Sequence, residues 1–179
     1  MGSPARVVVL LRGVNVGRAK RIAMAELAAI LSDLGATDVR TLLNSGNAVC
    51  TTRLAPAKLA SAVETAIEKR LGFGCDVVVR TRGQVAAVVA HDPLADVATD
   101  PSRYLVVFLG STPSAEALAR LREVDAAPEQ WVHEGDELYL WMPAGVADSV
   151  VSKHLAKGVL GVTWTGRNVA TVRKILDAM

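Results

Sequence analysis

Apolar and polar positions in the first fifty residues follow first the strand period and then the helix period. Arg6–Leu11 is a continuous, mostly β-branched run, which is typical of a buried strand. Apolar residues then recur at helical spacing from Met24 to Leu34. Two β-rich runs, 38–43 and 48–52, flank the turn-forming sequence Asn44–Asn47. This pattern predicts a strand, a helix and a β-hairpin in that order.

A second helix and a fourth strand complete the first half of the chain. Apolar residues line one face at a spacing of four over 59–71, after Pro56, a residue type that suits the first turn of a helix. Gly72 and Gly74 end this helix, and Cys75–Arg80 reads as a strand. The order βαββαβ is that of a ferredoxin-like fold.

The same order restarts after a proline-containing stretch. A short helix at 82–90 leads into 91–102, which holds Pro93 and Pro101 and reads as a linker. The elements expected after it are a strand at 103–109, a helix at 113–123, a hairpin of 130–133 and 137–142, a helix at 148–157, a short strand at 162–164 and a helix at 168–179. We therefore expect an α+β protein with two tandem ferredoxin-like halves packed together, 1–90 and 103–179, and an extra C-terminal helix.

Composition places the chain among globular proteins. The hydrophobic fraction is 51% and the charged fraction 21%, values that exclude a disordered or collagen-like chain. No apolar run approaches the roughly 20 residues of a membrane-spanning helix, and the first residues show no secretory pattern. The two cysteines, Cys50 and Cys75, fit packed thiols better than a disulfide framework. We expect a cytosolic protein with no membrane partner.

Charge is distributed unevenly although the net charge is only +2. Residues 1–48 hold six Lys/Arg and three Asp/Glu, and residues 150–179 hold five and one. The middle of the chain, 49–149, holds nine and fourteen. If the two ends meet in space, they form one basic face on a mildly acidic body.

Motifs at both ends of the chain resemble those of an uncharacterised bacterial family, domain of unknown function 1697. The resemblance rests on Leu10–Gly17, Met24, Val39–Thr41, Asn44–Asn47, Ser152-Lys153 and Thr165–Val172. The chain departs from the family pattern at Leu42, where tyrosine is usual, and at Val169, where tryptophan is usual. The resemblance implies a shared fold and a set of important positions, but no assigned activity.

The N-terminal motif has the position of an anion-binding loop. Arg12–Gly17 lies between a strand and a helix, and Lys20 follows just before the helix, whose N–H groups attract anions. The glycine spacing matches neither the dinucleotide fingerprint nor the phosphate loop, so a plain loop with solvated arginines is the alternative. In Asn44–Asn47, the residues Asn44, Ser45 and Asn47 either serve a tight turn alone or also contact a polar ligand.

The C-terminal motif contains one cation in an unexpected place. Asn168 is predicted to cap the last helix by accepting from the N–H of Ala170 or Thr171. Arg167 precedes that cap and would oppose the helix dipole unless an anion lies between them. Ser152, Lys153 and His154 point in different directions on a helix, which argues against a catalytic cluster but leaves Lys153 able to reach a phosphate.

Histidine positions argue against a metal site, and the hairpin strands of the first half hold no aromatic residue, which argues against the standard RNA-recognition surface there. The three histidines lie in different elements, and no His/Cys/Asp spacing matches a zinc or calcium motif. Trp131, Trp141 and Trp164 either stack on bases or, as we favour, fill the interface between the halves.

Together these features favour a non-enzymatic or weakly enzymatic protein that binds a phosphate-bearing ligand, with nucleic acid as one candidate, on a basic face. No cofactor is expected. The residues assigned to the ligand are Arg12, Asn15, Lys20, Asn44, Ser45, Asn47, Lys153, Arg167, Asn168 and Thr171. One alternative is an enzyme that acts on a phosphorylated or acyl-type small molecule in the crevice between the halves. Another is a structural or partner-binding module.

Overall fold

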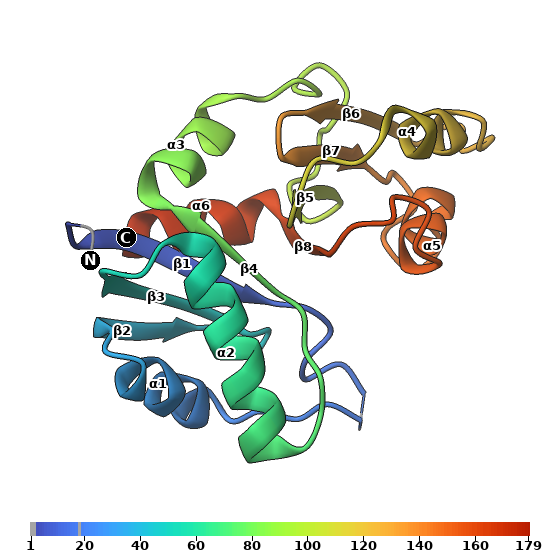
Figure 1. The fold of residues 1–179 in the computed structure, drawn as a ribbon. Helices are drawn as coiled ribbons and strands as arrows, with labels where there is room; N and C mark the ends of the chain where they lie inside the picture. Colours follow the sequence, from blue (N-terminus) through green and yellow to red (C-terminus); the bar gives the residue numbers. More distant parts are fainter. Residues whose placement is uncertain (1–2, 18) are drawn as a thin grey trace. The chain divides into compact units, whose positions relative to one another are not determined.

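The computed structural model describes residues 3–17 and 19–179 and divides into two compact units. Unit 1 comprises Met1–Ala90 together with Arg173–Met179, and unit 2 comprises His91–Val172. The same order of strands and helices occurs in both units (Figure 1). Each unit is described by itself below.

Unit 1 is a four-stranded antiparallel sheet with the strand order β2-β3-β1-β4. Its elements are β1 (Ala5–Leu11), α1 (Met24–Asp33), β2 (Thr37–Leu42), β3 (Asn47–Thr52), α2 (Pro56–Leu71), β4 (Val77–Thr81) and α3 (Arg82–Ala90). This order and connectivity are ferredoxin-like.

The core of unit 1 forms where α1 and α2 cover one face of the sheet (Figure 1). Alternate residues of β1, such as Val9 and Leu11, point to this face because the side-chain period of a strand is two. Leu27 and Leu31 of α1 meet them there, with no solvent exposure. Each such side chain contributes about 1.5–3 kcal/mol of transfer free energy.

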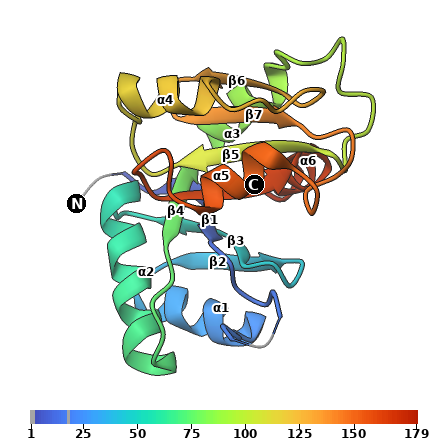
Figure 2. The same cartoon turned by 90° about the vertical axis from the view of Figure 1, so that its right-hand side faces the viewer.

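Unit 2 repeats the arrangement, with the strand order β6-β7-β5-β8. Its elements are β5 (Tyr104–Leu109), α4 (Ala115–Arg122), β6 (Gln130–Glu134), β7 (Glu137–Trp141), α5 (Val150–Ala156), β8 (Trp164–Asn168) and the start of α6 (Val169–Ala178). Leu121 of α4 and Leu155 of α5 pack with Val107 and Leu138 of the sheet. Figure 2 shows α4 and α5 with the strands of unit 2. The predicted α+β class and the tandem ferredoxin-like halves are confirmed.

The last strand, β8, differs from its predicted position. The sequence favoured 162–164, whereas the structure places the strand at Trp164–Asn168, paired with β5 from Leu109 to Leu105. Glycine and asparagine have low strand propensity, but an edge strand tolerates them. A Cβ at Gly166 would lie 2.9 Å from Leu105 Cδ2, so a larger residue there would make the end of the Leu105 side chain shift.

The start of α6 agrees with the sequence. The Thr171 N–H donates to Asn168 Oδ1 at 2.8 Å, which is the predicted cap. Val172 and Ile175 of this helix are buried, in agreement with the predicted apolar face.

The tryptophans pack within unit 2. Trp131 and Trp164 lie against its core, and Trp141 is buried. The Arg122 guanidinium lies 5.8 Å from the centre of the Trp131 ring, and the Trp164 indole donates to Leu155 O at 3.1 Å. The burial of Trp141 and the packing of the other two rings explain the tryptophans without a base-stacking role.

Both cysteines are buried free thiols, as predicted. Burial raises the pKa of Cys50 to about 11 and also raises the pKa of Cys75. Because the thiolate is the reactive form, we expect iodoacetamide at pH 8 to label neither cysteine in the folded protein and both in denaturant. Mass spectrometry after timed labelling checks this; rapid labelling of the native protein would contradict the burial.

Among the described residues, no helix combines the length and the apolar character needed to cross a bilayer.

Candidate functional site

Asn15 organises the loop between β1 and α1. Its Nδ2 donates to Ile22 O at 2.9 Å and to Asn44 O at 2.8 Å, and its Oδ1 accepts from the Ile22 N–H at 3.0 Å. Its φ of 58° lies in the left-handed region, which asparagine tolerates better than most residues. The side chain therefore ties the loop to the turn between β2 and β3, and its amide is used within the fold.

Two predicted ligand-binding cations attach the same loop to the segment before β4. Arg12 Nη1 lies 3.1 Å from Asp76 Oδ2, and the Arg12 N–H donates to Asp76 O at 2.9 Å. Lys20 Nζ donates to Gly74 O at 2.7 Å. Both side chains thus have structural partners, and Arg12 is only partly exposed.

The turn between β2 and β3 is held by its own side chains. Asn47 is fully buried, and its Nδ2 donates to Leu42 O and to Ser45 Oγ, both at 2.9 Å. Gly46 O accepts from the Leu11 N–H at 2.9 Å, which joins the turn to the end of β1. Of the three predicted site residues here, Ser45 and Asn47 brace the turn, whereas the Asn44 side chain is exposed.

A pocket of about 520 Å³ opens where this loop, this turn and the start of α1 converge. We call it the α1 pocket; it is lined by Asn15, Arg21, Ile22, Ala23, Met24 and Asn44. Arg21 is exposed and forms no ion pair within the described part of the chain. It is a cation beside a helix N-terminus, the end that carries partial positive charge.

The first turn of α1 has no capping side chain. The residue before the helix, Ala23, has extended backbone and a methyl group that cannot accept a hydrogen bond. N–H groups at a helix start need an acceptor from a side chain, water or a ligand. The acidic residue of this turn, Glu26, contacts Arg70 at 3.3 Å, which offsets part of its negative charge.

The equivalent position in unit 2 has the opposite properties. Ser114 caps α4 by accepting from the Ala117 N–H at 3.1 Å. The carbonyl that corresponds to Gly46 O belongs to Asp136, which accepts from the Leu109 N–H at 2.9 Å. The turn of unit 2 is acidic, with Glu134, Asp136 and Glu137, whereas the corresponding turn of unit 1, Asn44–Asn47, holds no charged residue. The loop before α1, residues 12–23, holds four Lys/Arg and no Asp/Glu. The start of the helix is therefore capped by a side chain in unit 2 and uncapped in unit 1.

The predicted site residues of the C-terminal motif belong to unit 2. Arg167 is buried in β8, and its Nη1 donates to Thr165 Oγ1 at 2.8 Å and to Gly166 O at 2.7 Å. Asn168 bonds the backbone N–H of Thr171, and exposed Lys153 lies 3.4 Å from Asp148 O. The Arg167 guanidinium therefore forms hydrogen bonds within its own strand.

Comparison with known proteins bears on the motifs of unit 1. A family model described as a protein of unknown function, DUF1697, matches residues 5–139, more than half of the chain. The chain belongs to this family. The DUF1697 match includes Asn15, Arg21 and Asn44 of the α1 pocket and ends before the C-terminal motif. A search of curated proteins gave no significant match.

A solved structure shares the fold of this DUF1697 protein. The conserved bacterial protein SP0830 from Streptococcus pneumoniae is similar with a TM-score of 0.77. The sequences are 23% identical, and the match covers 98% of this chain and 99% of that one. At this identity the likeness shows the fold alone.

Sequence reasoning did not assign Arg21 to the site. The sequence did contain a signal for this site. Two cations, Lys20 and Arg21, come just before Ala23, and no Ser, Thr, Asp or Asn stands next to the start of the helical pattern at Met24. A helix start with no capping residue and with a cation beside it differs from a helix start whose N–H groups are satisfied by its own capping side chain.

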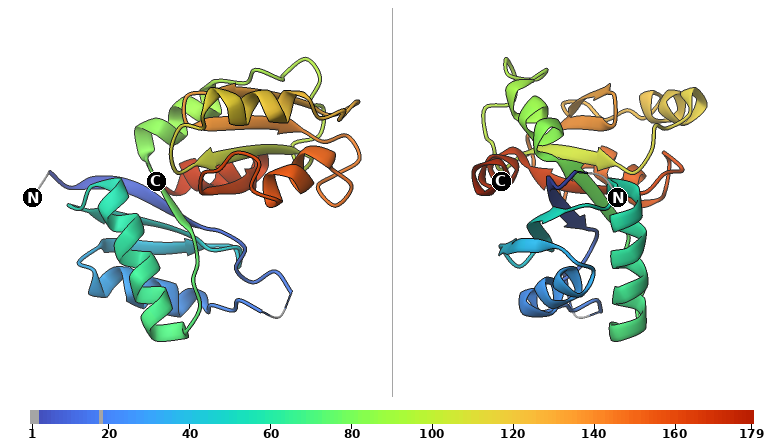
Figure 3. Two further views of the ribbon diagram at one scale, coloured as in Figure 1. Left: turned by 45° about the vertical axis from the view of Figure 1, so that its right-hand side comes forward. Right: turned by 60° about the vertical axis from the view of Figure 1, so that its left-hand side comes forward.

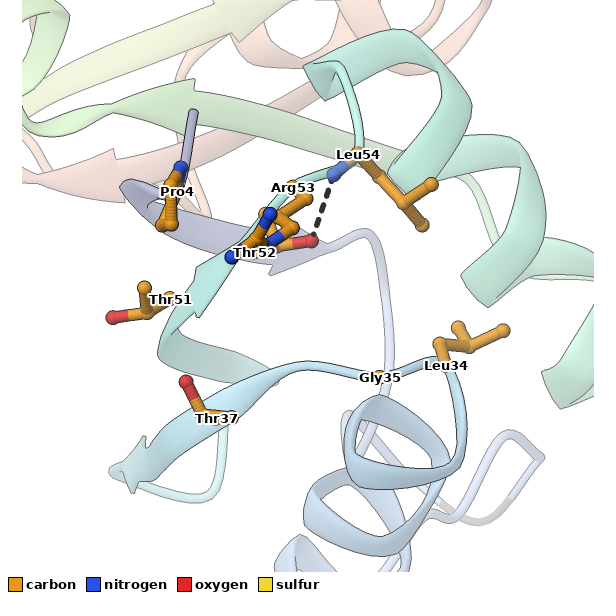
Figure 4. A pocket seen from close by; sticks show the side chains of 8 residues that line it. All are labelled: Pro4, Leu34, Gly35, Thr37, Thr51, Thr52, Arg53 and Leu54. Carbon is orange, nitrogen blue, oxygen red and sulfur yellow. Dashed lines mark hydrogen bonds between the residues drawn. The ribbon is translucent and has the colours of Figure 1, made fainter. Parts of the chain in front are cut away.

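A second hollow of about 390 Å³ lies at the opposite end of the unit 1 sheet, beside Thr52 at the end of β3. Figure 4 shows the Leu34 and Leu54 side chains on one side of it and Thr37 and Thr51 on another. Arg53 is the one charged residue among those that line it. Over the described residues, no group of three His, Cys, Asp or Glu side chains could hold a metal ion.

Proposed function

We propose that unit 1 of this DUF1697 protein binds a phosphate-bearing ligand in the α1 pocket. The observation that carries the proposal is the uncapped start of α1 next to Arg21, at a position that unit 2 closes with Ser114 and acidic residues. Backbone N–H groups at a helix start and a guanidinium group are the kinds of hydrogen-bond donor that bind phosphate oxygens well.

The lining of the α1 pocket favours binding over acid-base or nucleophilic catalysis. None of its six lining residues carries a carboxylate, imidazole, thiol or hydroxyl group. Asn44 offers an exposed amide, and Arg21 offers a permanent charge. These groups can hold and orient an anion, but they provide no general base. The role that we propose is therefore that of a binding protein, with nucleic acid and small phosphorylated molecules as candidate ligands.

The decisive test is an NMR titration with inorganic phosphate. We expect saturable shifts of the backbone amides of Met24 and Ala25, and no shift of the amides at the start of α4, where Ser114 already supplies an acceptor. Replacing Arg21 by alanine should weaken binding about tenfold, because one charge-assisted hydrogen bond is worth about 1.5 kcal/mol.

Arg53→Ala is the matched control, because Arg53 is another exposed arginine of unit 1 that lies in the hollow of Figure 4. It removes the same charge without touching the α1 pocket. Equal affinity of wild type and Arg21→Ala, or equal loss in both variants, would refute the assignment. Anisotropy of a labelled oligonucleotide over a salt series then separates nucleic acid, which gives a steep salt dependence, from a small phosphorylated ligand.

A further inference from the structure

The outer edge of β6 in unit 2 is an unprotected strand edge. β6 lies at the end of its sheet, and its five residues pair with β7 in an unbroken register from Gln130 to Glu134. Apart from that ladder, no backbone group of β6 has a hydrogen-bond partner within the described chain. Its other row of N–H and C=O groups is therefore free to pair.

The corresponding edge in unit 1 is protected, which shows what β6 lacks. The register of β2 against β3 shifts between Thr37 and Arg40, and Asp38 there has a φ of 50°. The Asp38 carbonyl accepts from Arg6 Nη1 at 2.9 Å. Bulges of this kind prevent a further strand from adding to an edge, and β6 has none.

A groove runs along the β6 edge. A hollow of about 520 Å³ is lined by the four consecutive residues Gln130–His133, together with Arg122 and Glu129. Successive side chains of a strand point to opposite faces of the sheet. Lining by four consecutive residues therefore favours a hollow that opens toward the edge of the strand.

The sequence of β6 is complementary to itself under a two-fold rotation. If a second copy pairs antiparallel about Val132, Val132 lies opposite Val132 of the second copy, and Trp131 lies opposite His133. Gln130 then lies opposite Glu134, so an amide can donate to a carboxylate. No two like charges face each other directly, and aromatic pairs across strands are favourable. A two-fold interface requires this kind of self-complementary patch.

We infer that β6 is a homodimer interface, at which two copies of this chain join their unit 2 sheets into one eight-stranded sheet. This proposal is independent of the ligand at the α1 pocket. One strand pair buries little surface, so the dimer is expected to be weak and to dissociate on dilution. A second copy is the occupant to which we commit, because pairing about Val132 opposes no like charges and places Gln130 opposite Glu134.

Disulfide trapping tests the register directly. Directly opposite residues of an antiparallel pair have Cα atoms about 4.5–5.5 Å apart, within the range of a disulfide. Val132→Cys should therefore form a reducible covalent dimer under mild oxidation, because Cys50 and Cys75 are buried and do not compete. Arg40→Cys, on the protected β2 edge, is the matched control and should remain monomeric.

Sedimentation velocity at concentrations up to about 1 mM provides the second arm. The wild-type chain should shift from monomer toward dimer, and Val132→Lys should remain monomeric, because two ammonium groups would face each other at the two-fold axis. A lysine on an edge strand is compatible with folding. A wild-type chain that stays monomeric throughout, a dimer that persists in Val132→Lys, or equal trapping at positions 132 and 40 would overturn the proposal.

Discussion

Replacing Gly46 by alanine is expected to lower the free energy of unfolding by about 2–5 kcal/mol. A Cβ at this position would lie 2.7 Å from Leu11 Cβ and 2.7 Å from Val14 Cγ2, distances that real Cβ contacts do not show. Gly46 also has a φ of 76°, where an L side chain costs about 1–2 kcal/mol. Because both atoms belong to buried residues, neither can move aside without disturbing the core of unit 1.

Gly13→Ala separates the cost of the left-handed backbone from the cost of the close Cβ contacts. Gly13 has a similar φ of 63°, but an added Cβ there would meet no atom within 4 Å. This variant should therefore lose only the backbone term, about 1–2 kcal/mol. Guanidinium unfolding of the wild type and both variants, followed by circular dichroism, measures the difference. Equal losses at the two positions would mean that the close contact of Gly46 with Leu11 and Val14 does not limit stability.

The regular elements were predictable because their patterns are local. The spacing of four from Leu59 to Leu71 and the glycine at position 72 predict α2 almost residue for residue, and Gly72 indeed has left-handed backbone. The β-branched run of β1 and the turn at Asn44–Asn47 likewise predict strands that the structure contains. In each case a few adjacent residues carry enough information.

Pairing in space explains why β8 was misplaced. Thr165–Asn168 contains glycine, arginine and asparagine, which do not indicate a strand, yet it pairs with residues 105–108 of β5 (Figure 3). The strand forms because β5 presents an edge to it. Information of this kind lies outside the segment itself.

In the candidate site, too, features that depend on adjacent residues were predictable, whereas contacts between distant parts of the chain were not. The loop position and the motif residues could be read from the sequence, but the partners of Arg12 and Lys20 could not. Asp76 and Gly74 lie more than fifty residues further along the chain, so these cations looked available for a ligand. The exposed Arg21, which the sequence did not single out, is the cation that lines the α1 pocket.

Asn15→Ala is expected to be the other strongly destabilising change, with a loss of about 2–4 kcal/mol. The variant removes three hydrogen bonds, to Ile22 O, the Ile22 N–H and Asn44 O, and leaves alanine at a φ of 58°. Guanidinium unfolding measures the total loss. Amide exchange of Ile22 gives a local readout, because its N–H would lose the Asn15 Oδ1 acceptor and should exchange faster than amides of β1.

Two further variants assign the loss at Asn15 to its causes. Asn15→Gly restores the backbone preference but not the hydrogen bonds, so it should recover about 1–2 kcal/mol relative to alanine. Asn15→Asp keeps the acceptor for the Ile22 N–H but turns the Nδ2 donor into an oxygen that faces two carbonyl oxygens. The free energy of unfolding of Asn15→Asp should therefore be lower than that of Asn15→Gly near neutral pH. Part of this difference should be recovered when acid protonates the carboxylate. If all three variants unfold at the same denaturant concentration as the wild type, the hydrogen bonds of Asn15 between the loop and the turn do not contribute to stability. The shape of the α1 pocket must then be maintained by the contacts of Arg12 and Lys20 with the segment before β4.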